Sequence, residues 1–292
     1  MYELVKVGDI SYYVSCPSKI GIVKLSEREV CLIDSGNNRD AGKRVKKILD
    51  AEGWTLSAIY NTHFHADHIG ANKYLSELTG AAIYAPGVDC ALTRHTILEP
   101  VTLFGGAPPA ELCHRFLLAE ESQAEYLTRD NVPSVLEPIS LPGHSFDMVG
   151  FRVADGTVFI ADALASREVL DKYGIFVVYD VGEYLKSLET LKTLEGKIFV
   201  PSHIEPTEDI SSLIDCNVKK IYEVAEKIEW ICREPKSHEQ ILAMLFSEYS
   251  LKMTVEQYAL VGSTVRSYIS WLRGLDRLEF IIEENRLLFK AK

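Results

Sequence analysis

The 292-residue sequence lacks closely spaced cysteines, a long apolar run and an excess of basic residues. Its six cysteines are scattered, and no C-x-x-C motif occurs, which argues against a dense disulfide framework and a thiolate metal site. No run approaches the roughly 18 apolar residues that a membrane span needs. The N-terminus carries an acid, Glu3, and lacks the basic and apolar regions of a signal peptide. We therefore expect a soluble, cytoplasmic protein.

The charge balance is acidic, with 31 Lys and Arg against 42 Asp and Glu and a net charge of -11. This balance argues against a dedicated nucleic-acid binder, which needs a basic face to neutralise phosphates. With 47% hydrophobic and 25% charged residues, the composition is that of a globular protein with a substantial core. The length predicts one large domain with an appendage.

Residues 1–210 show alternating strand and helix patterns, which predict α/β layers. The predicted strands lie at 10–14, 20–25, 30–33, 58–60, 82–85, 135–141, 149–153, 158–161 and 197–200. The predicted helices lie at 40–54, 69–78, 110–127 and 183–194. The stretch 88–131 interrupts the alternation, and we interpret it as a lid or oligomer-contact insertion.

Residues 211–292 form a second predicted domain without further strand-helix alternation. Helices are expected at 213–232, 237–247, 254–260 and 263–273, followed by a hairpin of strands 278–282 and 286–289. The last three of these helices, followed by the hairpin, have the winged-helix order. The segment carries about a dozen charges of each sign, which favours a packing or dimerisation module over nucleic-acid binding.

The strongest chemical signal is the motif Thr62-His63-Phe64-His65-Ala66-Asp67-His68, which follows predicted strand 58–60 and opens a helix. Residues two apart at a strand end point the same way, so His63 and His65 can bind one cation together. Asp67 and His68 lie at the turn into the helix, where they can face a second cation. Imidazole and carboxylate donors suit a borderline metal such as zinc.

Three further donors follow predicted strands. His144 lies in Leu141-Pro142-Gly143-His144-Ser145, Asp162 ends the apolar run 158–161, and His203 follows strand 197–200. Five of the eight histidines thus lie at strand ends, where the sites of α/β proteins gather. The other three, which lack such a context, are His95, His114 and His238.

With these residues the chain resembles the metallo-β-lactamase superfamily, whose signature is H-x-H-x-D-H followed by His, Asp and His at strand ends. The resemblance covers about residues 10–203 and implies a four-layer αβ/βα sandwich with a dinuclear site. It implies that one metal is held by His63, His65 and His144, and the other by Asp67, His68 and His203, with Asp162 between them. Asp34, in Leu32-Ile33-Asp34-Ser35-Gly36, matches the acid that orients the ligand loop.

The expected metal is zinc, with iron or manganese as alternatives. Two divalent cations, two carboxylates, five neutral imidazoles and a bridging hydroxide leave a charge of roughly +1, and such a pair can generate hydroxide near neutral pH. The hypothesis is a metal-dependent hydrolase that uses this hydroxide, with Asp67 as a catalytic residue that orients it.

Departures from the family pattern reduce the number of candidate reactions. Asp162 stands where the antibiotic-hydrolysing members have a cysteine ligand, and His65 stands where the oxygen-reducing diiron members have Glu. The stretch from Asp162 to His203 is too short for the cap domain of the large nucleic-acid-processing members. What remains resembles the glyoxalase II-like thioester hydrolases, the lactonases and small nucleases with a winged helix.

The sequence also allows other partners and functions. A small anionic substrate is expected, with nucleic acid as a less favoured partner and a homodimer as one assembly. A metal-binding sensor would carry the same ligands and a winged helix but no turnover. A mononuclear iron dioxygenase on the same fold would hold one iron per chain.

Overall fold

The computed structural model describes residues 2–292. Its strands are β1 (Glu3–Lys6), β2 (Ser11–Ser15), β3 (Ile20–Lys24), β4 (Glu29–Ile33), β5 (Thr55–Tyr60), β6 (Ala82–Ala85), β7 (Ala124–Tyr126), β8 (Leu136–Ser140), β9 (Val149–Val153), β10 (Thr157–Ala161), β11 (Ile198–Pro201), β12 (Leu278–Glu283) and β13 (Arg286–Ala291). Its α-helices are α1 (Arg39–Glu52), α2 (Ala66–Ile69), α3 (Asn72–Thr79), α4 (Gly87–Arg94), α5 (Leu98–Phe104), α6 (Arg167–Tyr173), α7 (Val181–Thr193), α8 (Ser211–Ile231), α9 (His238–Glu248) and α10 (Val255–Gly274).

Two sheets form the body of the molecule. Strands β1 to β7 lie in sequence order in the larger sheet, antiparallel from β1 to β4 and parallel from β4 to β7. The smaller sheet has the order β11-β10-β9-β8, with only β10 and β11 parallel. Strands β4, β5, β10 and β11 therefore end near one edge of the sandwich, where loops can carry converging side chains.

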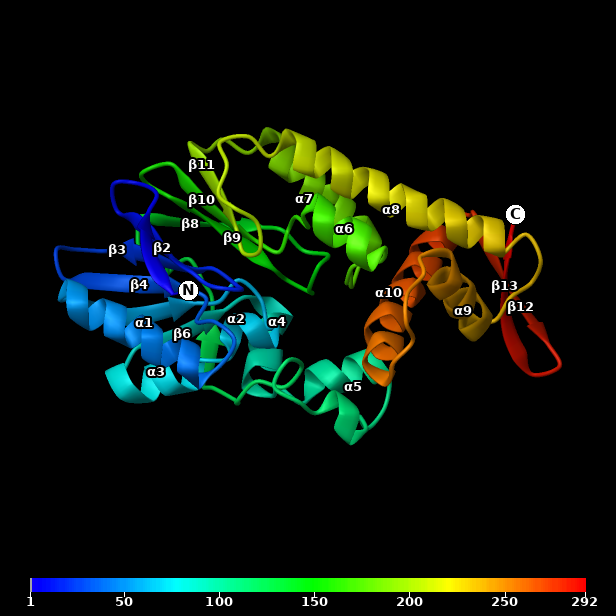
Figure 1. Ribbon diagram of the computed structural model, residues 1–292, viewed down its shortest axis with the longest axis horizontal. Helices are drawn as coiled ribbons and strands as arrows, with labels where there is room; N and C mark the ends of the chain where they lie inside the picture. Colours follow the sequence, from blue (N-terminus) through cyan, green and yellow to red (C-terminus); the bar gives the residue numbers. More distant parts are fainter. Residues whose placement is uncertain (1) are drawn as a thin grey trace.

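The core has three apolar layers, which explains the four-layer architecture. Val23 and Tyr60 of the larger sheet pack against Phe151 and Phe159 of the smaller one. A second cluster fills the space between the larger sheet and helices α1 and α3. A third covers the outer face of the smaller sheet with α7 and α8, which lie to the right of that sheet in Figure 1. The predicted αβ/βα sandwich is confirmed.

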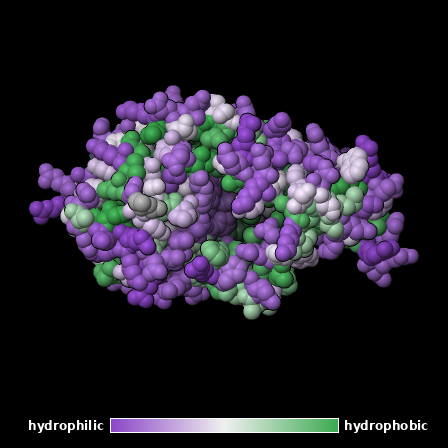
Figure 2. Space-filling model, in the orientation of Figure 1, coloured by the Kyte–Doolittle hydropathy of each residue, from purple (hydrophilic) through white to green (hydrophobic). Residues whose placement is uncertain are grey.

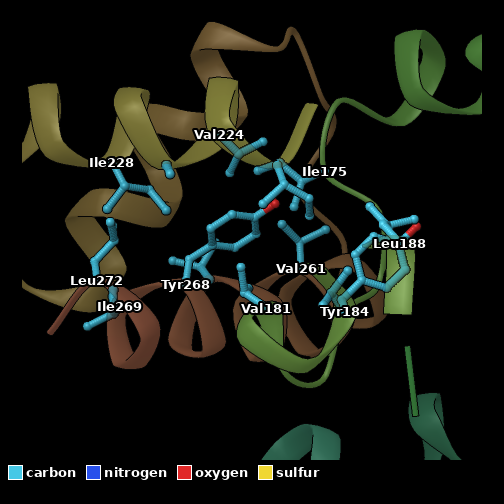
Figure 3. Packing of buried hydrophobic residues seen from close by; sticks show 14 of the residues in the cluster. Ile175, Val181, Tyr184, Leu188, Val224, Ile228, Val261, Tyr268, Ile269 and Leu272 are labelled. Atoms are coloured by element: carbon cyan, nitrogen blue, oxygen red, sulfur yellow. The ribbon is translucent and has the colours of Figure 1, made fainter. Parts of the chain in front are cut away.

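The C-terminal helices share the third cluster with the sandwich. Helix α8 runs from the smaller sheet toward the C-terminus, where α9, α10 and the terminal hairpin gather (Figure 1). Figure 3 shows the Tyr268 ring of α10 between Val224 of α8 and residues near α7. One apolar core runs through both parts, so the packing is continuous across the predicted division at 210/211, and the division itself stays a prediction.

The predicted helix 69–78 is wrong in one respect, because the chain forms two helices there. Helix α2 ends at Ile69, and α3 begins at Asn72. A Cβ on Gly70 would lie 2.4 Å from the backbone of Asn37. The Ser35 hydroxyl also accepts a hydrogen bond from the Ala71 backbone N–H. These contacts separate the short helix that carries Asp67 and His68 from the rest.

The predicted helix 110–127 is wrong. That stretch holds a 3-10 turn, Ala110–Leu112, and the edge strand β7, in which Ala124 pairs with Ile83. Leu112 and Leu117 pack against Ala259 of α10, so tertiary contacts override the helical spacing. The helices of this insertion are α4 and α5, which the sequence pattern did not indicate.

The helices predicted at 254–260 and 263–273 are one helix, α10. Gly262 lies inside it, and its carbonyl accepts a hydrogen bond from the buried His238 ring, which fixes the backbone there. Two helices, α9 and α10, therefore lie between α8 and the hairpin where three are predicted, and a winged helix stays a prediction. Within residues 2–292, none of the helices is long and apolar enough for a membrane span.

Candidate metal centre

All seven predicted donors converge at one edge of the sandwich. His63 and His65 lie in the loop after β5, and Asp67 and His68 lie on α2. The other three, each in a loop that follows a strand, are His144 after β8, Asp162 after β10 and His203 after β11. At Ala161 the backbone adopts φ 50°, an uncommon conformation for a non-glycine residue, immediately before Asp162.

The donor atoms fall into two groups that meet at one carboxylate. In the first group, the Nδ1 atom of His65 lies 3.0 Å from His63 Nε2 and 3.1 Å from His144 Nε2. In the second, Asp67 Oδ2 lies 3.4 Å from the Nε2 atoms of both His68 and His203.

Asp162 lies between the two groups. Its Oδ2 is 3.2 Å from His203 Nε2, 3.4 Å from His68 Nε2 and 3.6 Å from His144 Nε2. Each of the three possible ligand sets, including His63, His68 and Asp162, has its donor atoms within 4.8 Å of one another.

Buried donor atoms of this cluster lack hydrogen-bond partners, as is expected of atoms that bind cations. Within residues 2–292, neither His68 Nε2 nor Asp162 Oδ1 has a hydrogen-bond partner, although both atoms are buried. His65 Nδ1 faces two imidazole nitrogens, and a single proton can satisfy only one of those contacts. Nitrogen and oxygen donors aimed at a common centre suit a divalent metal such as zinc.

Asp34 supports both groups from behind. Its carboxylate accepts hydrogen bonds from the backbone N–H and the hydroxyl of Thr62 and from Nδ1–H of His68, each 2.8 Å long. The Thr62 oxygen lies 2.9 Å from Nδ1 of His63, whose proton it can accept. One buried carboxylate therefore orients one imidazole in each group.

Two backbone carbonyls fix the other rings. The carbonyl of Val177 accepts a 2.9 Å hydrogen bond from Nδ1 of His144, and that of Pro17 accepts a 2.8 Å bond from Nδ1 of His203. Because a carbonyl can only accept, Nδ1 carries a proton in both rings, and Nε2 is the ring atom that faces the centre.

Burial keeps the first group neutral. Burial, reinforced by the neighbouring His144, lowers the pKa of His65 to about 3. Burial also lowers the pKa of His63 and of His144. These imidazoles are therefore unprotonated near pH 7 and ready to bind a cation.

The second group attracts positive charge. The carboxylate of Asp162 raises the pKa of His203 to about 10 against the effect of burial. For His68, burial lowers the pKa, but the charges of Asp67, Asp162 and Asp34 together outweigh it and raise the pKa well above the ordinary value. In the metal-free protein, protons thus occupy the place that a cation would fill.

A largely apolar pocket leads to the donors. Its floor carries His65, Asp67, His144 and Asp162. Its walls come from the loops of the sandwich, from the 88–131 insertion and from α10, and include Phe64, Leu103, Phe116, Leu117, Phe146, Val178 and Leu260. Figure 2 shows the surface hollowed between the sandwich and the C-terminal helices.

Three residues at the site carry no signal in the sequence. The Ser18 hydroxyl, from the loop between β2 and β3, donates to Asp67. Asp89 of α4 accepts hydrogen bonds from Phe64 N–H and from Ser145 O–H, and so holds both ligand loops. Glu99 of α5 lines the pocket at only 6% exposure.

The fold and the donor set define the class of the protein, a sandwich of two sheets with a candidate metal centre at its strand ends, as the sequence predicts. The chain belongs to the metallo-beta-lactamase superfamily, whose family model matches residues 15–203. The match runs from Ser15, the last residue of β2, to His203, and so includes every donor.

Known relatives match parts of the chain. A hydroxyacylglutathione hydrolase of Erythrobacter litoralis is 51% identical over 45 residues, which are 15% of this chain and 18% of that protein. The chain therefore matches less than a fifth of that relative's length. An uncharacterized protein of Mycobacterium tuberculosis is 30% identical over 160 residues, which are 50% of this chain and 68% of that protein.

Solved structures match nearly the whole chain. A beta-lactamase domain protein from Burkholderia ambifaria superposes with a TM-score of 0.79 at 15% identity, over 99% of this chain and 94% of that one. The C-terminal helices and hairpin are therefore part of a shared fold. The superfamily and fold class predicted from the sequence are confirmed, while the ligand role of each residue stays a prediction.

Proposed function

We propose that the chain is a dinuclear hydrolase of a thioester, ester or lactone. The observation that carries this proposal is the pair of donor groups that both lie within 3.6 Å of Asp162 Oδ2 and open into an apolar pocket. The preferred metal is zinc, because the donors are imidazoles and carboxylates, and iron or manganese are the alternatives. The partial match to hydroxyacylglutathione hydrolases supports an acyl substrate.

The residues of the site have different roles in the proposed hydrolysis. When bound, the two cations supply Lewis acidity and lower the pKa of a coordinated water. Asp67 offers Oδ1 to orient the attacking water, because its Oδ2 accepts the Ser18 hydroxyl. The neutral imidazoles of His63 and His65 keep their lone pairs available, and the apolar walls restrict water around the scissile bond.

The pocket favours an acyl group over a phosphodiester. A polymeric phosphodiester carries one negative charge per linkage and needs basic side chains along its path. No Lys or Arg is among the residues that line this pocket, within the described part of the chain. A small nuclease is therefore the second candidate, and a mononuclear iron dioxygenase is the third.

The test is a screen of the purified chain loaded with zinc, iron or manganese against acyl thioesters, lactones, phosphodiesters and RNA. We expect hydrolysis of an acyl substrate by a chain with two cations. Asp162→Ala should lower kcat/KM at least 100-fold, while the matched control His95→Ala, which removes an exposed histidine that does not line the pocket, should retain activity. Full activity and metal content in Asp162→Ala would contradict the proposal, and one iron per chain with oxygen uptake would favour the dioxygenase.

A further inference from the structure

The loop 16–19 between β2 and β3 contacts the second donor group through consecutive residues. The Pro17 carbonyl accepts the hydrogen bond from Nδ1 of His203. The next residue, Ser18, donates its hydroxyl to Oδ2 of Asp67. The loop thus reaches one donor from α2 and one from the loop after β11, which lie far apart in the sequence.

Lys19 fastens the same loop to the other sheet. Its backbone N–H donates to the Ser202 carbonyl over 2.9 Å, and its ammonium donates to the Ile204 carbonyl over 2.8 Å. These two bonds lie on either side of His203. Lys19 is only 8% exposed, so the contacts are shielded from water and are stronger than similar bonds on the surface.

The loop also holds its own shape. The Cys16 thiol donates to the Ser18 carbonyl over 2.9 Å. Ser18 itself is 4% exposed, so its hydroxyl has little water to compete with Asp67. The hydrogen bond from Ser18 to Asp67 therefore lies in a turn that is shielded from water.

The first donor group is supported by other parts of the chain. His144 is oriented by Val177 and His63 by Thr62. Within residues 2–292, no hydrogen bond joins loop 16–19 to His63, His65 or His144. The two groups therefore have separate supports, and only the second depends on this loop.

We propose that Ser18 is a positioning residue through which loop 16–19 sets the affinity of the second cation. The inference rests on the proposed two-cation function. The side chains of Asp67 and His203 are 36% and 38% exposed, so each can turn toward solvent unless a neighbour holds it. A partner of this kind behind a metal ligand typically contributes 10- to 100-fold in affinity.

The experiment compares the wild-type chain with Ser18→Ala, Ser18→Thr and Ser26→Ala. Ser26 is the matched control, because it lies in the next loop and its hydroxyl accepts only the Glu29 N–H. Stepwise dissociation constants come from zinc titration against a chromophoric chelator, and the geometry from the absorption spectrum of the cobalt-loaded chain.

We expect Ser18→Ala to bind the first zinc as tightly as wild type and the second about 10- to 100-fold more weakly. Its cobalt spectrum should lose intensity from the second site only. Ser18→Thr, which keeps the hydroxyl, should recover at least part of the second affinity, and Ser26→Ala should match wild type.

Two results would overturn this role. In one, Ser18→Ala keeps both constants within twofold of wild type. In the other, it weakens both cations equally and lowers the melting temperature of the metal-free chain, which is the mark of a general folding defect. A wild-type chain that takes up a single zinc would refute the two-cation function as well, so the two failures are distinguishable.

Discussion

Replacement of Asp34 by Asn tests the support that both donor groups share. Asp34 has φ 62°, a conformation that Asn tolerates better than most residues, and the two side chains are nearly equal in size. The backbone turn after β4 should therefore persist. What changes is that an acceptor oxygen becomes an NH2 donor.

The consequence follows from the three hydrogen bonds of Asp34. If the Asn oxygen keeps the Thr62 N–H, its NH2 group faces Nδ1 of His68, which must then become an acceptor. The His68 proton moves to Nε2, the atom that faces Asp67 and Asp162. That tautomer cannot bind a cation through Nε2, so we expect a 10- to 100-fold loss of affinity, about 1.4–2.7 kcal/mol.

The assay is the chelator competition titration, combined with urea unfolding of the metal-free chain. Loss of one charged hydrogen bond should lower the free energy of unfolding by about 1.5–3 kcal/mol. The control is Asp155→Asn, which removes a carboxylate that accepts from Ile10 N–H and Thr157 N–H away from the donors. Asp155→Asn should lose stability without losing metal, and a wild-type zinc affinity in Asp34→Asn would refute the reasoning.

Three further predictions concern protons, backbone and pocket. Because the pKa of His203 is raised to about 10 and that of His68 is also raised, the second cation should displace close to two imidazole protons at pH 7 and the first close to none. A coordinated water that becomes hydroxide adds one proton to this release. The affinity for the second cation should therefore rise more steeply with pH than that for the first; calorimetry in buffers of different ionisation enthalpy counts the protons, and equal release in both steps would contradict the assignment. Gly143→Ala should lower both kcat/KM and the free energy of unfolding, the latter by about 1–3 kcal/mol. The reason is that Gly143 has φ 117° and that a Cβ there would lie 2.2 Å from the Tyr184 nitrogen. A variant as stable as wild type in urea would show that the loop before His144 is not constrained in this way. Glu99→Leu should raise the melting temperature. Burial raises the pKa of Glu99, and no group within residues 2–292 donates a hydrogen bond to its carboxyl. A lower melting temperature would indicate a partner for this carboxyl.

The donors could be predicted from the sequence because their positions obey local rules. His63 and His65 stand two apart after an apolar strand, and His144, Asp162 and His203 follow strands of their own. Strand ends of a layered α/β fold meet at one edge, so the pattern alone places these residues together.

The supports of the donors could not be predicted, because only tertiary structure creates them. Ser18 reaches Asp67 when the loop after β2 folds over the cluster, and nothing in its neighbours indicates this. Glu99 lies on α5, a helix that the sequence pattern does not indicate. Similarly, Ala124 pairs with Ile83 as an edge strand although its surroundings favour a helix.

Anomalous scattering from crystals of the zinc-loaded chain tests the central claim most directly. Two zinc peaks about 3.5–4 Å apart are predicted, each about 2.0–2.2 Å from its ligand atoms. One peak should have His63, His65 and His144 as ligands, the other should have Asp67, His68 and His203, and Asp162 should contact both. A single peak, or peaks away from these seven side chains, would contradict the account.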